Sequence, residues 1–245
     1  MTNAGFDPAF FMNIRLKTIL DCIDPDSCGV ADVGTDHGIL PVTLALNGFH
    51  GNILASDIRE GPLRHAMDTA KEKDVADRIR FFLCDGLLEE FSELVDTIVI
   101  AGMGGDMICS IIDRADWLLD SHYTLILQPM TKAEVLRYYL TNNGFEIRKE
   151  HHVPDRTHLY SVIITNFTGQ NTLSPLIDLY TGRQEDYMDP DLYRRSLEKL
   201  LTEAGKKTSA QDAKHLPETE YYRELTVRLT EALNELTGRD HGNKE

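Results

Sequence analysis

The chain has few of the features that mark secreted, disulfide-bonded or membrane-spanning proteins. It has four cysteines among 245 residues, and its apolar residues, 42% of the total, form no run near the roughly 20 needed to span a bilayer. The cysteines form no Cys-x-x-Cys pair and have no histidine at ligand spacing, so we expect reduced thiols and no metal site. No basic segment followed by a long apolar stretch indicates a secretory signal. These absences predict a cytoplasmic protein that binds neither metal nor membrane.

Basic residues are scarce relative to acidic ones. The 25 lysines and arginines stand against 40 aspartates and glutamates, which gives a formal net charge of −15. Because like charges repel, this balance argues against indiscriminate binding to DNA, to other nucleic acids or to anionic membranes. A nucleic-acid partner would have to contact a local basic patch.

Short apolar runs, each followed by a turn and then by helical patterning, fill the first 130 residues. Their apolarity is continuous, which is typical of parallel strands that helices cover on both faces. Two later runs are joined through Pro154-Asp155, and this short turn predicts an antiparallel pair. The predicted strands are Val30–Val33, Ile53–Ala55, Ile79–Leu83, Thr97–Ala101, Thr124–Leu127, Glu146–His151 and Leu159–Asn166. The sequence therefore predicts an α/β domain over residues 1–167, in which Thr131 and Glu134 form a capping box.

After Phe167 the patterning becomes that of helices. Residues 168–171 have the composition of a linker, and leucines then recur at helical spacing along two segments. Pro190 and Pro217 stand where first helical turns are expected, and Gly205 and Gly238 where the helices would end. Residues 168–245 are thus predicted to form a second domain, a coiled-coil-like helical hairpin.

Four turns rich in aspartate and glycine stand where apolar runs end, at residues 31–38, 55–62, 83–87 and 100–106. The carboxyl ends of consecutive parallel strands lie along one edge of a sheet, which is where open α/β folds bind ligands. An isolated pair of aspartate and glycine often forms only a turn. Four such turns in the same relation to their strands predict one pocket.

The charges of these turns discriminate between nucleotide ligands. Carboxylates at Asp32, Asp36, Asp57 and Asp85 would surround the ligand with negative potential, which disfavours a pyrophosphate. S-adenosylmethionine fits better, because it carries a ribose, an adenine and a sulfonium but no phosphate. Asp57 lies where a carboxylate accepts both hydroxyl hydrogens of a ribose, and Asp85 is placed to accept from the adenine amino group.

Glycines in the first and fourth turns predict close approach of the backbone to this ligand. Gly34 and Gly38 would admit the methionine part, with its carboxylate at the helix start near His37. Met103 would supply an apolar wall in the fourth turn, although a glycine-rich loop that only opens a helix is the alternative reading. The predicted donor-site residues are Asp32, Gly34, Asp36, His37, Gly38, Asp57, Ile58, Asp85, Gly86, Ala101, Gly102 and Met103.

Several short motifs extend over residues 13–166. They are DVGTDHG at 32–38 with Leu40-Pro41, Gly61-Pro62, DGL at 85–87, IAGMGG at 100–105, LILQP at 125–129 and Asn143-Gly144-Phe145. In these motifs the chain resembles the bacterial TrmK family of tRNA (adenine-22 N1)-methyltransferases. The resemblance implies a class I, Rossmann-like methyltransferase fold with a mostly parallel seven-stranded sheet. It also implies S-adenosylmethionine as donor, S-adenosylhomocysteine as product and tRNA as partner.

The chain departs from the family's pattern at two places. Family members often have a small residue and then an aromatic after the Asp-His of the first motif, whereas this chain has Gly38-Ile39. Position 130 is Met where Asn is frequent. Both departures concern positions near which the substrate base is expected to stack.

Adenine N1 carries a lone pair and no proton, so its methylation needs alignment and exclusion of water rather than a general base. The catalytic candidates are Met103 and Gly104, next to the reacting centre, and Asp36, which would stabilise the developing positive charge. Asp36 is equally typical of a loop-capping acid, and Asp106 is a weaker candidate for the same role. The motif Asn/Asp-Pro-Pro-Tyr/Phe, typical of methylation at exocyclic amino groups, is absent from the sequence, and this favours a ring nitrogen.

Basic side chains form three candidate tRNA patches, and the resemblance to the TrmK family implies that the helical hairpin helps engage tRNA. The candidate contacts are Arg15, Lys17, Arg59, Arg64, Arg148 and Arg156, which are also compatible with an ordinary solvated surface. Two other functions remain open: methyl transfer to another nucleic acid or a small molecule, and binding of the donor or of tRNA without catalysis.

Overall fold

The computed structural model describes residues 13–155, 158–212 and 219–242, and the chain divides into two compact units, 1–172 and 173–245. The division falls after Thr172, whereas the sequence suggested a boundary after Phe167. The intervening residues are tied to the first unit by their backbone. The amide of Thr168 donates to the carbonyl of Gly144 at 2.8 Å, and that of Thr172 donates to the carbonyl of Thr141 at 2.8 Å.

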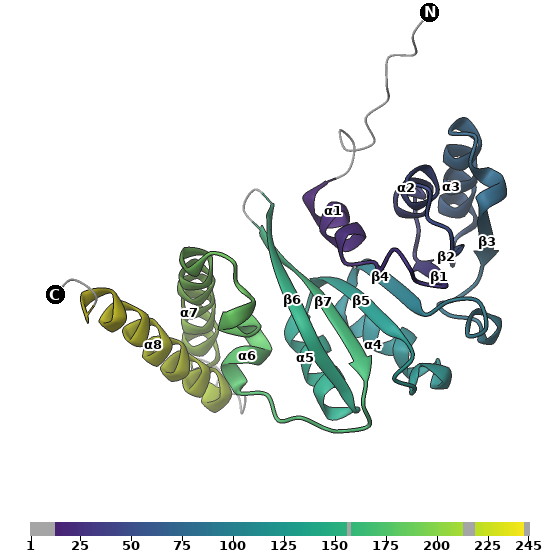
Figure 1. Ribbon diagram of the computed structural model, residues 1–245. Coiled ribbons are helices and arrows are strands. Elements are labelled where there is room, and N and C mark those ends of the chain that lie inside the picture. Colours follow the sequence, from purple (N-terminus) through teal and green to yellow (C-terminus); the bar gives the residue numbers. More distant parts are fainter. Residues whose placement is uncertain (1–12, 156–157, 213–218, 243–245) are drawn as a thin grey trace, which may run out of the picture. The chain divides into compact units, whose positions relative to one another are not determined.

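A seven-stranded sheet with the order β3-β2-β1-β4-β5-β7-β6 forms the centre of the first unit (Figure 1). Strands β1 to β5 are parallel, and β7 runs antiparallel to both β5 and β6. The predicted class of sheet and the predicted antiparallel pair are confirmed. The strands are β1 (Gly29–Val33), β2 (Asn52–Asp57), β3 (Ile79–Leu83), β4 (Thr97–Gly104), β5 (Thr124–Thr131), β6 (Phe145–Asp155) and β7 (His158–Phe167).

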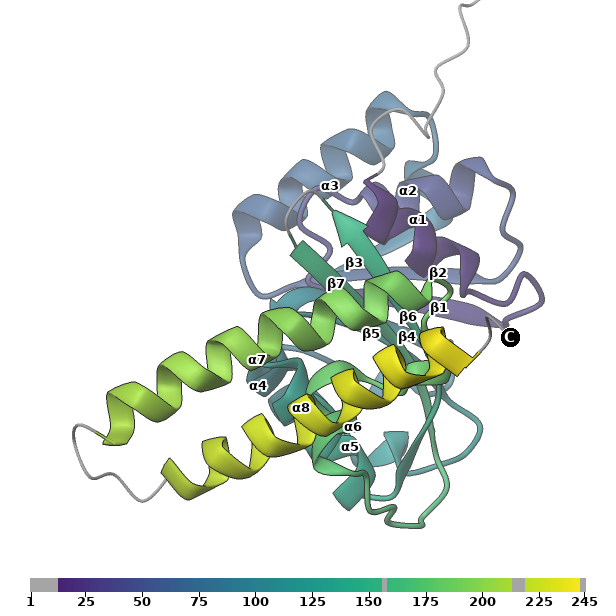
Figure 2. The same cartoon turned by 90° about the vertical axis from the view of Figure 1, so that its left-hand side faces the viewer.

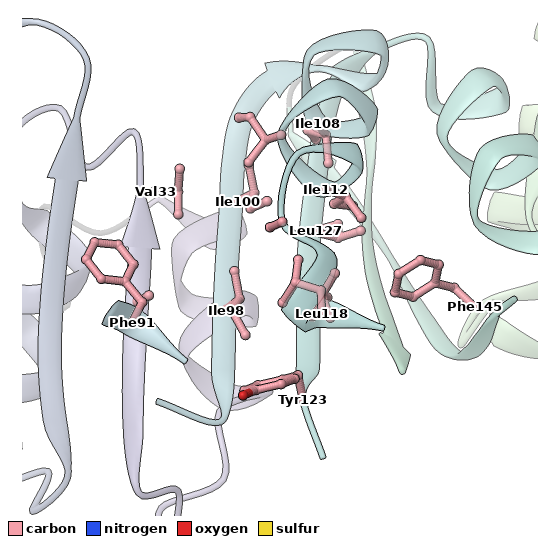
Figure 3. Packing of buried hydrophobic residues seen from close by; sticks show 14 of the residues in the cluster. Val33, Phe91, Ile98, Ile100, Ile108, Ile112, Leu118, Tyr123, Leu127 and Phe145 are labelled. Atoms are coloured by element: carbon pink, nitrogen blue, oxygen red, sulfur yellow. The ribbon is translucent and has the colours of Figure 1, made fainter. Parts of the chain in front are cut away.

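Helices cover both faces of this sheet, as the continuous apolar strands require. One face packs against α1 (Ile14–Asp21), α2 (Ile39–Leu46) and α3 (Glu60–Glu72), the other against α4 (Gly105–Asp113) and α5 (Ala133–Asn142). Figure 3 shows Ile98 and Ile100 of β4 beside Ile108 and Ile112 of α4, all at most 3% exposed. Short 3₁₀ turns complete this unit at Ala76–Arg78, Glu89–Phe91 and Asp116–Leu118.

The capping box predicted at the start of α5 is wrong. Strand β5 continues through Thr131, because that residue pairs with Gly104 of β4. Lys132 takes the N-cap position instead, with a left-handed φ of 57° and no side-chain cap bond. The long-range strand pairing therefore overrides the local capping signal.

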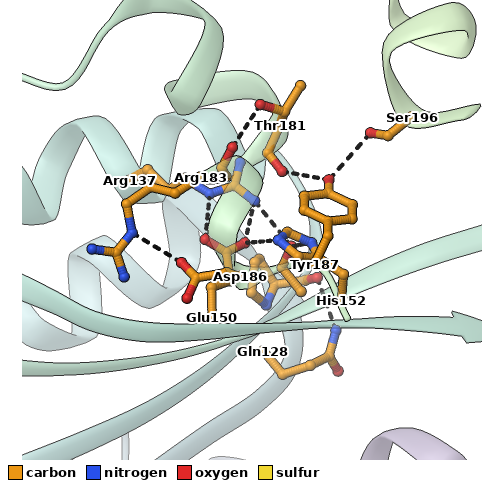
Figure 4. Close-up of polar contacts among 12 residues, drawn as sticks. Gln128, Arg137, Glu150, His152, Thr181, Arg183, Asp186, Tyr187 and Ser196 are labelled. Atoms are coloured by element: carbon orange, nitrogen blue, oxygen red, sulfur yellow. Dashed lines mark hydrogen bonds and ion pairs between the residues drawn. The ribbon is translucent and has the colours of Figure 1, made fainter. Parts of the chain in front are cut away.

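One buried ion pair lies between α5 and the β6–β7 hairpin (Figure 4). Arg137 and Glu150 are 3% and 2% exposed, and the guanidinium bonds both oxygens of the carboxylate and also Ser161 Oγ at 2.9 Å. Burial alone would raise the pKa of Glu150, but Arg137 outweighs it and leaves that pKa below its usual value. The pair is satisfied on both sides, as a buried charge requires.

The second unit is helical (Figure 2). It contains α6 (Leu176–Thr181), a 3₁₀ turn (Gln184–Asp186), and two long helices side by side, α7 (Pro190–Asp212) and α8 (Thr219–Gly242). The predicted hairpin and the position of Pro190 are confirmed, and Pro217 lies outside the described residues. The predicted ends at Gly205 and Gly238 are wrong, because both helices run through them. Buried Leu197, Ala204, Leu225 and Leu229 provide packing that outweighs the roughly 1 kcal/mol cost of a glycine inside a helix.

Two further observations concern the residues that the structure describes. None of their helices combines the length and the apolarity that a transmembrane span requires. Within the same residues, no group of three or more His, Cys, Asp or Glu side chains is arranged to hold a metal ion.

Candidate donor-binding site

A cavity of about 580 Å³ lies where the carboxyl ends of the parallel strands meet. It is centred on β1 and β4, between which the order of the strands reverses, so it occupies the usual ligand position of an open α/β sheet. Its wall contains residues from all four turns. They include Gly34 and Asp36 from the first, Asp57 from the second, Asp85 from the third and Met103 from the fourth.

Backbone hydrogen bonds join neighbouring turns. The amides of Gly34 and Thr35 both donate to the carbonyl of Ser56, at 2.8 and 2.9 Å, and tie the first turn to the end of β2. The amide of Cys84 donates to the carbonyl of Asp57 at 3.1 Å and ties the third turn to the second. The three turns are therefore held in one fixed arrangement.

Asp57 is the carboxylate that this arrangement fixes most firmly. Its side chain is almost fully buried, and its Oδ1 accepts from the amide of Arg59 at 2.9 Å while Oδ2 accepts from that of Asp36 at 3.3 Å. A carboxylate accepts about four hydrogen bonds in all. Asp57 therefore keeps acceptors for a pair of neighbouring hydroxyl groups, such as those of a ribose.

Asp32 lies deeper, near the end of β1. Burial raises the pKa of this carboxyl to about 6; the Thr35 hydroxyl opposes the rise and the charge of Asp57 adds to it. A buried carboxylate that lacks a cationic partner favours the binding of a positively charged ligand. The cavity therefore suits a cation in its interior.

Asp85 has a partner that the sequence did not indicate. Arg114, the C-cap residue of α4, donates to both carboxylate oxygens, at 2.7 and 3.0 Å. These hydrogen bonds hold the pKa of Asp85 below its usual value. The pair is about half exposed, so an adenine amino group would share the carboxylate with the guanidinium.

The first and fourth turns approach each other across the cavity. A Cβ atom on Gly34, where φ is +76°, would fall 2.2 Å from Cε of Met103, so the methionine side chain lies directly over this glycine. Gly102 also has a left-handed φ of +79°, with no atom within 4 Å of an added Cβ. Asp106, which follows these glycines, forms a 2.6 Å ion pair with Lys132 at the surface.

Gly38 is the predicted donor-site residue that does not line the cavity. It is the N-cap of α2, with a φ of +69°. A Cβ there would lie 2.8 Å from Cβ of Ala66, so the backbone of α2 packs tightly on α3 at this point. This close packing accounts for a glycine at the position, whereas contact of Gly38 with the donor stays a prediction.

The structure brings the other predicted donor-site and catalytic residues together in the cavity wall. They are Asp32, Gly34, Asp36, His37, Asp57, Ile58, Asp85, Gly86, Ala101, Gly102, Met103 and Gly104.

Of the basic candidates, Arg15 and Arg59 also line the cavity. Arg64 and Arg148 pair with Glu60 and Glu146 on the surface, at 2.5 and 3.4 Å. Lys17 is exposed on α1, and Arg156 lies outside the described residues.

Several wall residues were not predicted. Ser56 directly precedes Asp57, and its buried Oγ has no hydrogen-bond partner among the described residues, so it offers a ligand one more polar contact. Gln128 lies opposite Ala101 in the sheet and is 1% exposed. Both residues stand beside motifs of the sequence, Ser56 before the second acid and Gln128 within LILQP, but no local pattern marks them as parts of a site.

Residues 12–163 match a family described as "Methyltransferase domain". The tRNA (adenine(22)-N(1))-methyltransferase of Bacillus subtilis (strain 168) is 29% identical over 168 residues, which are 69% of this chain and 70% of the relative. A putative tRNA methyltransferase of Mycoplasma genitalium is 30% identical over 156 residues, 62% of this chain and 69% of that protein.

A solved structure covers both units. The putative tRNA (m1A22) methyltransferase of Streptococcus pneumoniae is 26% identical, with a TM-score of 0.78 over 91% of this chain and 100% of the other. The same protein has been solved in complex with S-adenosyl-L-methionine, and that structure matches with a TM-score of 0.74.

Proposed function

The chain belongs to the TrmK family of methyltransferases, and we propose that it transfers a methyl group from S-adenosylmethionine to N1 of adenine 22 in tRNA. The observation that carries this proposal is the cavity between β1 and β4, where the order of the strands reverses. Four carboxylates line it, and the turns around it do not have the sequence pattern of a phosphate-binding loop. Two relatives supply the substrate, because the Bacillus subtilis one is named a tRNA (adenine(22)-N(1))-methyltransferase and the Streptococcus pneumoniae one a putative tRNA (m1A22) methyltransferase. A tRNA substrate fits a cytoplasmic location.

The residues present fit the donor. Asp57 holds the two ribose hydroxyls, Asp85 accepts from the adenine amino group, and the exposed side chain of Ile58 covers one face of the adenine. The unpartnered Ser56 hydroxyl supplies a further hydrogen bond at the same end. Asp32 faces the positively charged part of the donor, which compensates the cost of burying its charge.

S-adenosylmethionine supplies an electrophilic methyl group on its sulfonium, and the protein has to align the target nitrogen with it. Gly102, where an added Cβ would have no atom within 4 Å, leaves room for the base beside the backbone, and Met103 forms an apolar wall that excludes water. Asp36, at the mouth of the cavity with a left-handed φ of 50°, stabilises the positive charge that develops on the adenine. Because N1 of a paired adenine is hidden, the nucleotide has to be unpaired or turned out of its helix.

Local basic side chains contact the RNA, because the chain as a whole carries a charge of −15 and does not attract RNA. Arg59 at the cavity mouth, Arg64 on α3 and Lys17 on α1 provide cations on the catalytic unit. The helical unit provides the remaining contact surface. This division assigns donor binding to the first unit and part of the RNA affinity to the second.

Methyl transfer to tRNA transcripts tests the proposal. Purified protein is incubated with unmodified tRNA and methyl-labelled donor, and the modified nucleoside is identified after digestion. We expect 1-methyladenosine at position 22 and no transfer when that adenine is replaced by guanine. Label that persists in the guanine transcript would contradict the position, and absence of label in every transcript would contradict the activity.

A further inference from the structure

Arg15 is a cation in the wall of the donor cavity that has no carboxylate partner among the described residues. The cavity wall contains four aspartates, and the other arginine there, Arg59, lies 3.8 Å from Oδ1 of Asp57. Arg15 forms no such ion pair with any residue that the structure describes. In a chain with 40 acidic side chains, a partly buried guanidinium without a counter-charge is unusual.

Three neutral groups hold this guanidinium in place. Its Nη1 donates to Oε1 of Gln128 at 3.0 Å and contacts Sδ of Met130 at 2.9 Å. Its central carbon lies 4.6 Å from the ring centroid of Tyr160, a cation–π contact. Gln128 is itself fixed, because its Nε2 donates to the carbonyl of Pro129 at 2.8 Å. The guanidinium is therefore positioned without being neutralised.

Two donors of Arg15 remain without an acceptor among the described residues. Both of its hydrogen bonds use Nη1, and Nε is a buried atom with no hydrogen-bond partner. Nε and Nη2 lie on one edge of the guanidinium, and this edge matches the two oxygens of a carboxylate or phosphate. The missing acceptor is therefore an anion with two oxygens.

Building on the proposed function, we propose that Arg15 binds the carboxylate of the methionine part of S-adenosylmethionine, and that Gln128 positions Arg15 for this contact. The donor's tail is the part that the acidic turns do not suit, since Asp32 and Asp36 repel a carboxylate. A cation in the same wall resolves this conflict. The proposal moves Arg15 from the RNA-binding candidates to the donor site.

The start of α2, where the sequence suggested that this carboxylate would bind, offers few amide donors. The amide of Gly38 already donates to the carbonyl of Thr35 at 2.9 Å, and Pro41 in the first turn of the helix has no amide hydrogen. A backbone phosphate of RNA is the other anion of suitable geometry. It is less well matched, because the open edge includes a buried Nε inside a cavity that the donor itself fills.

Calorimetric binding of two ligands tests the proposal without requiring turnover. S-adenosylhomocysteine carries the amino-acid tail, and 5′-methylthioadenosine has the same nucleoside without it. We expect Arg15→Met to weaken S-adenosylhomocysteine binding about 10- to 100-fold, as loss of a charge-assisted hydrogen bond implies, and to leave methylthioadenosine binding unchanged. Gln128→Ala should weaken the first ligand selectively but less strongly, and Arg15→Lys should retain part of the affinity.

The exposed Arg80 on β3 provides a matched control, because Arg80→Met removes the same charge outside the cavity. Equal loss for both ligands in Arg15→Met would overturn the proposal by showing a structural role only. Unchanged binding of both ligands, with or without weaker tRNA binding, would also overturn it and favour an RNA phosphate. These binding measurements do not depend on methyl transfer. If Arg15→Met selectively loses S-adenosylhomocysteine binding but the protein does not methylate adenine 22, the proposed function is contradicted and the role of Arg15 is not.

Discussion

Replacing Asp32 with asparagine is expected to stabilise the folded protein at neutral pH while weakening its donor site. The carboxyl is 7% exposed, and burial raises its pKa from 3.8 to about 6. A change of one in pKa corresponds to about 1.4 kcal/mol, so keeping this carboxylate ionised at pH 7 costs the folded state about 3 kcal/mol. An asparagine side chain has nearly the same shape as an aspartate but carries no charge. We therefore expect Asp32→Asn to raise the free energy of unfolding by up to about 3 kcal/mol.

The raised pKa of Asp32 determines how the stability difference between Asp32→Asn and the wild type varies with pH. Because the pKa of Asp32 is higher in the folded state, the folded protein binds more protons than the unfolded chain between about pH 4 and 6. The contribution of Asp32 to stability therefore falls as pH rises through this window. The stability difference between variant and wild type should be near zero at pH 4, grow up to pH 6 and stay constant above it.

Urea unfolding of both proteins at several pH values measures this difference, with Asp68→Asn on the surface of α3 as a control for net charge. A variant less stable than the wild type at pH 7, or a difference that does not vary with pH, would refute the reasoning. Calorimetry on the same variant should show weaker binding of S-adenosylmethionine. Under the proposed function the ionised Asp32 attracts the sulfonium, so the group that lowers stability would be retained for binding.

Two further substitutions test the donor site and the packing behind it. Asp57→Asn should weaken S-adenosylmethionine binding by about 1–3 kcal/mol, because each ribose hydroxyl loses a charged acceptor; unchanged affinity in calorimetry would remove Asp57 from the ribose site. Gly38→Ala should lower the free energy of unfolding by about 2–4 kcal/mol, since a left-handed residue gains a Cβ that clashes with Ala66. Gly61→Ala is the control, because an added Cβ there has no atom within 4 Å, and a similar loss of stability in both variants would contradict the packing argument.

The parts of the fold that were predicted correctly depend on short stretches of chain. Continuous apolar runs such as Thr97–Ala101 indicate parallel strands buried on both faces, and the observed β4 contains that run. The last two apolar runs lie too close together in the sequence for a crossover, so they had to be antiparallel. Pro154 and Asp155, predicted as the turn between them, belong instead to β6 and pair with Leu159 and His158 of β7. The order of strands in a sheet then places all four turns at one edge. Most of the cavity wall follows from this geometry.

The incorrect or missing predictions involve residues far apart in the sequence. Pairing with Gly104 keeps Thr131 in a strand although its local sequence is typical of a helix cap. The partner of Asp85 is Arg114, 29 residues away, and no local pattern announces such a pair. The close approach of Gly38 to Ala66 on the next helix likewise has no signal in the local sequence.

Arg15 shows that contacts between residues far apart in the sequence also determine which function a residue is assigned. In the sequence its nearest charged neighbour is Lys17, and two cations on an acidic protein suggest contact with RNA. In the structure its neighbours are Gln128 and Tyr160, both more than 100 positions away, and they hold the guanidinium inside the cavity. Net charge describes how the whole surface acts on a distant partner, whereas the ligand of a partly buried charge depends on the groups packed around it. The negative charge of the protein is therefore compatible with an RNA substrate, and Arg15, which has no carboxylate partner among the described residues, suits the carboxylate of a zwitterionic donor.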